Sequence, residues 1–233
     1  MFYSRSRLLA LSAIIALFVS VASTTTISKE LVPAQNGPNI VIGPKKSFKP
    51  MPPSTPRTKT CEVKEGGRDD SPAILEAIKE CNDGGKVIFK RGAKYTIGTA
   101  LDLRNLRHID LVIQGTIQFT SDTSYWQRSA FKYRYQNAAS FFALGGIDVN
   151  VYGGGTIDGN GHVWESVFAR NKDAIRPILF CVNGMNGGTV SDLTMKSSPQ
   201  WFNLVIDSKN VVFSNIRING HQKNTDGWDT VRV

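Results

Sequence analysis

The stretch Val190-Ser191-Asp192-Leu193-Thr194-Met195 is matched, position for position, by Phe213-Ser214-Asn215-Ile216-Arg217-Ile218. The offset is constant, from position 190 to position 213, and a period in the low twenties is typical of a solenoid. A unit of that size cannot bury its own apolar residues, so neighbouring units must stack on one another. The repeat therefore predicts a stacked architecture for this part of the chain.

A weaker repeat of the same kind lies upstream. Ile109-Asp110-Leu111 and Gly115-Thr116-Ile117 are matched by Ile147-Asp148-Val149 and Gly155-Thr156-Ile157. The larger offset is explained by an inserted loop at residues 121–140. The pairs predict that the two segments stack as successive coils.

Short apolar runs broken by Gly, Asn and Asp follow from Lys86 onward, as expected for short strands. They include Val87-Ile88-Phe89, Tyr95-Thr96-Ile97, Leu111-Val112-Ile113 and Val211-Val212-Phe213. The strand-rich, repeating content predicts an all-β fold, a parallel β-helix. Leucine-rich repeats share the period but need Leu spacing and helices that are absent here, and an antiparallel sandwich has no reason to repeat a pattern at this spacing.

One helix is predicted near the start of the folded part. Ser71 or Asp70 is the expected N-cap, Pro72 takes the first helical position, and residues 82–85 (Asn-Asp-Gly-Gly) end the helix. We expect this helix to cover the open N-terminal end of the coil stack, which otherwise presents unpaired apolar residues.

The first residues have the pattern of a secretory signal. Arg5 and Arg7 precede an apolar run at residues 8–21, and small residues follow. A membrane anchor is the alternative, although the run is short for a span. We expect residues 1–23 to be a signal peptide, 24–60 a Pro-rich linker or pro-region with seven of the ten prolines, and 61–233 a partial β-helix domain. The protein is therefore expected to be secreted and extracellular.

The chain is basic, with a formal net charge of +9. Loss of Arg5 and Arg7 with a signal peptide leaves about +7, which favours an anionic partner such as an acidic polysaccharide. No compact Lys/Arg block with interleaved aromatics is present, so nucleic acid is not expected as a partner. No membrane partner, metal or cofactor is expected, and the protein is expected to be a monomer.

Three cysteines occur in the chain. In an oxidising compartment Cys61 and Cys81 form a plausible disulfide across a short loop, stabilising by about 3 kcal/mol through loop entropy. Cys181 is left over, either as a buried thiol or as one that has lost its partner. No Cys/His spacing is typical of zinc, because His108, His162 and His221 are far apart in the sequence.

The segment Lys223-Asn224-Thr225-Asp226-Gly227-Trp228-Asp229-Thr230 collects two carboxylates, an amide, a hydroxyl and an ammonium within a short run. A carboxylate acts as acid or base only if its surroundings set its pKa and a partner group lies nearby. Asp226 and Asp229 are three positions apart, so in an extended strand they point to opposite faces. They form no acid/base pair unless a turn or bulge at Gly227 redirects one of them.

Two motifs carry a specific resemblance. Gly153-Gly154-Gly155-Thr156-Ile157-Asp158-Gly159-Asn160-Gly161, then Trp164, and Asn224-Thr225-Asp226-Gly227-Trp228-Asp229 resemble signatures of the polygalacturonase family, glycoside hydrolase family 28. The resemblance covers about residues 60–233 and is nearest to fungal exo-acting members. It implies a right-handed parallel β-helix and hydrolysis of α-1,4 bonds between galacturonic acid residues, with inversion.

By this resemblance Asp226 is one of the carboxylates that orient and deprotonate the attacking water, and Asn224 helps to fix its position. The family's later Asp-Asp, Gly-His-Gly and Arg-Ile-Lys motifs are not present in residues 1–233. The last coils are therefore expected to be missing, and the chain by itself is expected to be inactive.

The remaining candidates concern substrate binding. Lys223 is expected to grip a substrate carboxylate, with His221 and Asp229 lining the groove, whereas solvated surface is the simpler role for Lys223 and His221. Trp201 is a candidate sugar platform, with core packing as the alternative. A non-catalytic pectin-binding β-helix and a rhamnogalacturonan hydrolase remain competing hypotheses; a calcium-dependent lyase is disfavoured because no acidic cluster appears.

Overall fold

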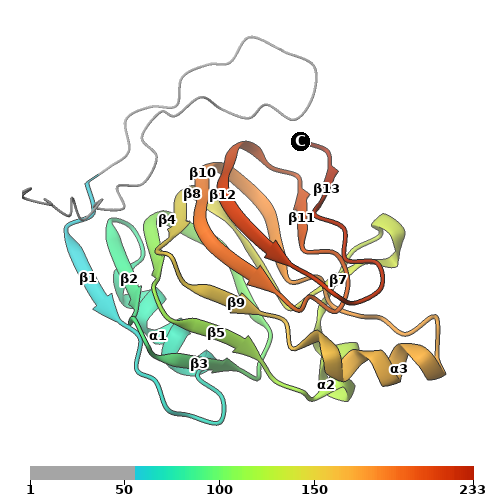
Figure 1. Ribbon diagram of the computed structural model, residues 1–233. Coiled ribbons are helices and arrows are strands. Elements are labelled where there is room, and N and C mark those ends of the chain that lie inside the picture. Colours follow the sequence, from blue (N-terminus) through green and yellow to red (C-terminus); the bar gives the residue numbers. More distant parts are fainter. Residues whose placement is uncertain (1–55) are drawn as a thin grey trace, which may run out of the picture. The chain divides into compact units, whose positions relative to one another are not determined.

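The computed structural model describes residues 56–233, so the expected signal peptide and most of the expected linker lie outside the described residues. Figure 1 shows strands wound into stacked coils. The strands are β1 (Lys59–Glu62), β2 (Gly85–Phe89), β3 (Lys94–Ile97), β4 (Leu101–Ile113), β5 (Thr116–Phe119), β6 (Phe131–Lys132), β7 (Ala139–Ser140), β8 (Phe142–Tyr152), β9 (Thr156–Asp158), β10 (Phe180–Lys196), β11 (Asn203–Ile206), β12 (Lys209–Asn219) and β13 (Trp228–Val231). The helices are α1 (Ser71–Cys81), α2 (Thr123–Ser129) and α3 (Glu165–Arg170), with short 3₁₀ turns η1 (Tyr135–Asn137) and η2 (Gly161–Trp164).

The strands stack in parallel columns. One column contains β1, β2, the second half of β4, and parts of β8, β10 and β12. Its inward-facing residues, each paired in register with the next, are Cys61, Val87, Leu111, Val151, Val190 and Phe213. A second contains β3, β5, β9 and the ends of β10 and β12. A third contains the first halves of β4, β8 and β10, then β11 and β13. The fold is the parallel β-helix that the period predicts, and it is right-handed, as the family resemblance implies.

The register confirms the repeat found in the sequence, because β10 pairs with β12 through Val190 with Phe213 and Met195 with Ile218. The weaker upstream repeat is confirmed only in part. Thr116 pairs with Thr156, and Ile117 with Ile157, as predicted.

The predicted pairing of Ile109 with Ile147 is wrong. Ile109 pairs with Val149, and Ile147 pairs with Arg107 and is 40% exposed. Alternation alone would put Ile147 and Val149 on the same face, so it could not reveal a slip of two positions. In the structure the corner at Asp148 lies between them, and Ile147 is exposed while Val149 is buried. The structure instead keeps the same offset in both strands, from Ile109 to Val149 and from Ile117 to Ile157.

The corners between columns recur at matching positions. His108, Asp148, Gly187 and Asn210 occupy one corner in successive coils, and all have positive φ. Asp192 and Asn215 do the same at the next corner, where Asn215 Nδ2 donates to Asp192 Oδ1 across 2.6 Å. Asn and Asp tolerate the left-handed region better than other side chains, which explains why they punctuate the sequence.

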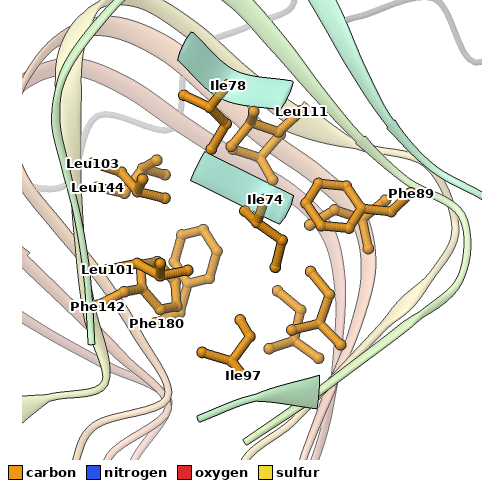
Figure 2. A pocket seen from close by; sticks show the side chains of 14 residues that line it. Ile74, Ile78, Phe89, Ile97, Leu101, Leu103, Leu111, Phe142, Leu144 and Phe180 are labelled. Atoms are coloured by element: carbon orange, nitrogen blue, oxygen red, sulfur yellow. The ribbon is translucent and has the colours of Figure 1, made fainter. Parts of the chain in front are cut away.

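Helix α1 closes the N-terminal end of the stack, as predicted. Asp70 is its N-cap, and Ile74 and Ile78 are directed into the interior of the coil (Figure 2). There they meet Phe89 and Leu111 around an apolar cavity of about 40 Å³. The helix thus covers apolar side chains that the first coil leaves open.

Helices α2 and α3 were not predicted from the sequence. Helix α2 lies in the inserted loop and begins after Asp122, whose side chain accepts from the Tyr125 backbone N–H. Both helices are short, seven and six residues, which gives too little periodicity for detection.

The third column is buried on both faces at its middle strands, β8, β10 and β11. Its inner face includes Phe180 and Val182 in the main core, and its outer face forms a second cluster of Ala138, Ile178, Cys181, Trp201, Leu204 and Ile206. Residues of the inserted loop, Tyr133 and Tyr135, pack over this cluster. Cys181 is therefore a buried free thiol, and its Sγ donates to Tyr133 Oη across 3.2 Å.

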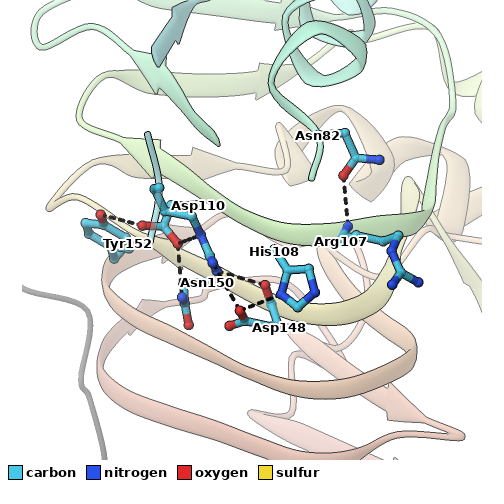
Figure 3. Close-up of polar contacts among 8 residues, drawn as sticks. Asn82, Arg107, His108, Asp110, Asp148, Asn150 and Tyr152 are labelled. Atoms are coloured by element: carbon cyan, nitrogen blue, oxygen red, sulfur yellow. Dashed lines mark hydrogen bonds and ion pairs between the residues drawn. The ribbon is translucent and has the colours of Figure 1, made fainter. Parts of the chain in front are cut away.

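The N-terminal coil is fastened in two ways. Cys61 and Cys81 form the predicted disulfide, which joins β1 to the end of α1. Arg57, with a side chain 4% exposed, lies 3.0 Å from both Asp110 Oδ1 and Asp148 Oδ2. Figure 3 shows Asn150 and Tyr152 also donating to Asp110, and His108 beside Asp148. Strand β1 begins at Lys59, two residues before the expected start of the domain at Cys61.

Candidate active site

The predicted site lies on the loop that joins β12 to β13, residues 220–227. Gly220 starts the loop, where a Cβ atom would come within 2.6 Å of the Phe202 ring. Thr225 Oγ1 donates to the Gln222 carbonyl across 2.9 Å, and Asn224 has a φ of 62°. The Phe202 N–H donates to the Asp226 carbonyl across 2.8 Å, which ties the loop's end to the coil below. The loop is thus a defined turn in the stack.

Arg176 anchors this loop from beneath. Its Nη1 donates to the Pro199 carbonyl across 2.6 Å and to the Lys223 carbonyl across 2.7 Å. Its Nη2 donates to Asn224 Oδ1 across 3.2 Å. The guanidinium also lies 3.8 Å from the centre of the Phe168 ring of α3. The side chain therefore joins three successive coils at the point where the site residues lie.

The sequence analysis did not single out Arg176. A signal was available, since Arg176 precedes Pro199 by 23 residues and Asn224 by 48, about one and two coils. Applying the coil period to the loops as well as to the strands would have placed Arg176, Pro199 and Asn224 above one another. Burial could not be read from the sequence, because Arg is seldom buried without a partner.

The predicted site residues fall into two groups by exposure. His221, Lys223, Asn224 and Asp226 are all exposed on one loop, so an ammonium, an amide and a carboxylate face solvent together. Such a set can hold a carboxylate of a ligand and position a water molecule beside Asp226.

Asp229 differs in its environment. It is half-buried in β13, and its Oδ2 is buried without a hydrogen-bond partner among residues 56–233. Burial raises the pKa of the Asp229 carboxyl, and the negative charge of Asp226 raises that pKa further. Asp226 lies before β13, so the rule that side chains alternate between the two faces of a strand does not apply to it. The charge of Asp226 thus acts on the Asp229 carboxyl, although no hydrogen bond joins the two groups among residues 56–233.

The two tryptophans near the loop serve packing. Trp201 is 7% exposed and packs against Tyr135 in the second cluster, with ring centroids 6.0 Å apart. Its burial favours the core-packing alternative over a sugar platform. Trp228 packs edge-on against Phe213 at 5.8 Å and keeps 38% of its surface exposed.

The glycine-rich motif at residues 153–161 is structural. Gly153 has a φ of 140°, and a Cβ atom there would lie 2.3 Å from the Ile113 carbonyl oxygen. Further along the motif, Asp158 is held by Gln118 and Lys196, and its Oδ1 accepts from the Asn160 N–H. The motif leads into η2 and α3, and Glu165 of α3 accepts from Gln222 Nε2 across 3.2 Å. It thereby brings α3 against the site loop.

Within the described part of the chain, no group of three or more His, Cys, Asp and Glu side chains is placed to hold a metal ion. Among those same residues, 56–233, every helix is too short or too polar to span a bilayer.

The site loop thus carries an exposed carboxylate, amide and ammonium on a turn of a stacked β-helix. Residues 81–233 match the glycosyl hydrolases family 28, and the chain belongs to this family. The family that the two motifs predict is therefore confirmed.

The chain is 55% identical over 202 residues to exopolygalacturonase X-1 of Emericella nidulans, covering 83% of this chain and 46% of that protein. The solved endo-xylogalacturonan hydrolase of Aspergillus tubingensis is 32% identical with a TM-score of 0.65, over 73% of this chain and 47% of that one. The polygalacturonase of Erwinia carotovora shares the fold with a TM-score of 0.61 at 20% identity, over 80% and 55% of the two chains. The chain thus spans about half the length of the curated relatives that it matches.

Proposed function

We propose that the protein hydrolyses α-1,4-galacturonosyl bonds of polygalacturonate, acts from chain ends, and inverts the anomeric configuration. Family membership and the similarity to an exopolygalacturonase support this proposal. The observation that carries it is the anchored loop, on which Asn224 and Asp226 are both exposed. Arg176 holds this loop through the Lys223 carbonyl and the Asn224 side chain.

The proposed roles follow from the chemistry of inversion. An inverting enzyme needs one carboxylic acid to protonate the leaving oxygen and a carboxylate to activate water on the opposite face. Asp226, exposed to solvent, suits the second role and accepts a proton from the attacking water. Asn224 orients that water through its amide. Lys223 binds a substrate carboxylate, and His221 and Asp229 line the same region.

Among the proposed binding residues, Lys223 depends most on a negative charge on the substrate. A lysine ammonium attracts a carboxylate and has little preference for a neutral sugar. The basic balance of the chain, a formal +9, also favours a polyanionic substrate. Secretion belongs to the same proposal and is supported by the Cys61–Cys81 disulfide, because disulfides persist in oxidising compartments. A monomeric state is part of the proposal as well.

The test is the digestion of polygalacturonate by the full-length protein, with products followed by proton NMR. We expect galacturonate to accumulate from the earliest times, with the new reducing end first appearing as the β-anomer. Early release of a ladder of oligomers would overturn exo action, and the α-anomer would overturn inversion. Faster digestion of xylogalacturonan would move the substrate assignment to that polymer.

Variants at the loop separate an enzyme from a binding module. Lys223→Gln should raise KM several-fold while leaving kcat within about twofold, since it removes uniform binding. Lys64→Gln is the matched control, because Lys64 is exposed and remote from the loop in the sequence. A protein that binds polygalacturonate and never cleaves it would support the binding-module alternative.

A further inference from the structure

An asparagine occupies an interior position of the third column. In the preceding coils this part of the inner face is apolar, and the rings of Phe142 and Phe180 meet edge-on at 5.2 Å inside the coil (Figure 2). Phe180 pairs in register with Asn203 of the next coil. Asn203 points the same way, because its neighbour Leu204 belongs to the outer cluster and Val205 to the main core. An amide thus replaces an apolar side chain in the core.

Burial of this amide is unfavourable. Asn203 is 0% exposed, whereas asparagine is mostly found at protein surfaces. Its Oδ1 is buried without a hydrogen-bond partner among residues 56–233. A buried polar atom without a partner loses the hydrogen bonds that it makes with water in the unfolded chain. A position that departs from the apolar pattern at such a cost is expected to serve a function.

The other end of the amide is directed at the site loop. Asn203 Nδ2 donates to the Gly227 carbonyl across 2.9 Å, and the backbone N–H of Asn203 donates to the same oxygen across 3.1 Å. The Phe202 N–H donates to the Asp226 carbonyl across 2.8 Å. Together these bonds hold the two peptide groups that flank the Gly227 Cα atom, directly after Asp226.

Gly227 supplies little restraint of its own. Glycine has the widest choice of backbone conformations, so the chain can swing most easily at this residue. A Cβ atom at Gly227 would meet only Ile218 Cδ1, at 3.8 Å, so neighbouring atoms do not confine this position tightly. A carbonyl oxygen has two lone pairs, and the Asn203 amide uses the one that the strand pairing leaves free. The side chain therefore adds a restraint that the backbone pairing lacks.

We propose that Asn203 is a positioning residue for Asp226. Its amide fixes the peptide group after Gly227 and so sets the direction in which the Asp226 carboxylate faces the attacking water. Asn203 itself lies in the core and touches neither the water nor the substrate. A misplacement of about 1 Å can lower a rate by up to about 10²-fold. The inference rests on the proposed function, in which Asp226 activates the water.

The decisive variant is Asn203→Leu, which keeps the branched shape of the side chain and removes the amide. The Gly227 carbonyl keeps the backbone N–H of residue 203, and the unpaired Oδ1 is lost, so thermal unfolding should stay close to that of the wild type. In the full-length protein, kcat on polygalacturonate should fall by about 10-fold to 100-fold, with KM within about twofold.

Val205→Ala is the matched control. Val205 lies on the same strand and the same inner face, is 6% exposed, and pairs with Thr230 beyond the site loop. This variant should unfold at a lower temperature and keep the wild-type kcat. An equal fall in kcat for Val205→Ala would mean that general loosening of the core lowers activity, and would overturn the inference. Asn203→Ala removes the amide without adding volume, and should reproduce the fall in kcat if leucine is not accommodated.

Hydrogen exchange measured by mass spectrometry provides a readout that does not need activity. Amide exchange at residues 224–228 of the full-length protein should be faster in Asn203→Leu than in the wild type and in Val205→Ala, because the loop opens more easily. Unchanged exchange would overturn the inference whether or not the protein is active.

The two proposals can fail separately. If the wild type hydrolyses polygalacturonate and Asn203→Leu keeps its kcat, Asn203 is not a positioning residue and the proposed function stands. If the wild type does not hydrolyse the polymer while Asn203→Leu speeds exchange at residues 224–228, Asn203 holds the loop and the proposed function is wrong.

Discussion

Arg176 Nη2 donates to Asn224 Oδ1 across 3.2 Å, although 48 residues separate the two in the sequence. The same guanidinium binds the carbonyls of Pro199 and Lys223. One buried side chain therefore sets the conformation of the loop that carries the candidate catalytic carboxylate.

Arg176→Ala should destabilise the protein by about 2 to 4 kcal/mol, because it leaves buried carbonyl groups without donors. Urea unfolding followed by far-UV circular dichroism measures this free energy. Arg170→Ala is the control, since Arg170 is exposed at the end of α3 and should change stability by less than about 0.5 kcal/mol. Equal effects of the two changes would mean that Arg176 does not anchor the coils.

Ile74→Ala should cost about 2 to 4 kcal/mol in the same assay, because it enlarges the apolar cavity under α1. Ile74 is 2% exposed and points into the coil (Figure 2). Its neighbour Leu75 is 40% exposed, so Leu75→Ala should cost less than about 0.5 kcal/mol. A similar loss for both variants would contradict the role of α1 as the cap of the stack.

Arg57→Met should destabilise by about 3 to 5 kcal/mol, because it leaves the buried carboxylate of Asp110 without its cation. The Asp110 side chain is only 3% exposed and is shared by Asn150 and Tyr152 (Figure 3). Lys59→Met removes a pair in which both side chains are more than half exposed, so it should cost less than about 1 kcal/mol. Thermal unfolding of both variants at one pH checks this difference.

Stability should fall at alkaline pH through Cys181. Burial raises the pKa of the Cys181 thiol to about 11. A folded pKa above the unfolded value near 9 gives a contribution that is complete below pH 9 and is lost as the pH rises through 11. The loss is at most about 3 kcal/mol, the equivalent of two pH units. Cys181→Ala should show a shallower decline in unfolding free energy between pH 8 and 11, and parallel curves would contradict the burial.

The repeat period was enough to predict the stacked strands, because a repeated apolar pattern has few structural solutions. The helix at Ser71–Cys81 was predicted from its N-cap, from Pro72 and from the residues that end it. The register at Ile109 was not predicted, because strand alternation by itself treats Ile147 and Val149 as equivalent partners. Only the corner at Asp148, which has positive φ, distinguishes the two alignments.

The position of the candidate site could be predicted from the sequence more easily than the residues that surround it. Asn224 and Asp226 were predicted from a local motif, and their catalytic role stays a prediction. Arg176 and Trp164 reach the same region from other coils, and their unpaired N–H groups depend on packing that no local pattern encodes. Trp201 illustrates the converse, because a tryptophan beside the motif turns out to lie in the core.

The most direct test is the rate of polygalacturonate hydrolysis by the full-length protein and by its Asp226→Asn variant, with folding checked by circular dichroism. Removing a carboxylate that activates water should lower kcat by about 10²-fold to 10⁴-fold with little change in KM. A folded Asp226→Asn protein that keeps the wild-type rate would show that the anchored loop is not the catalytic centre.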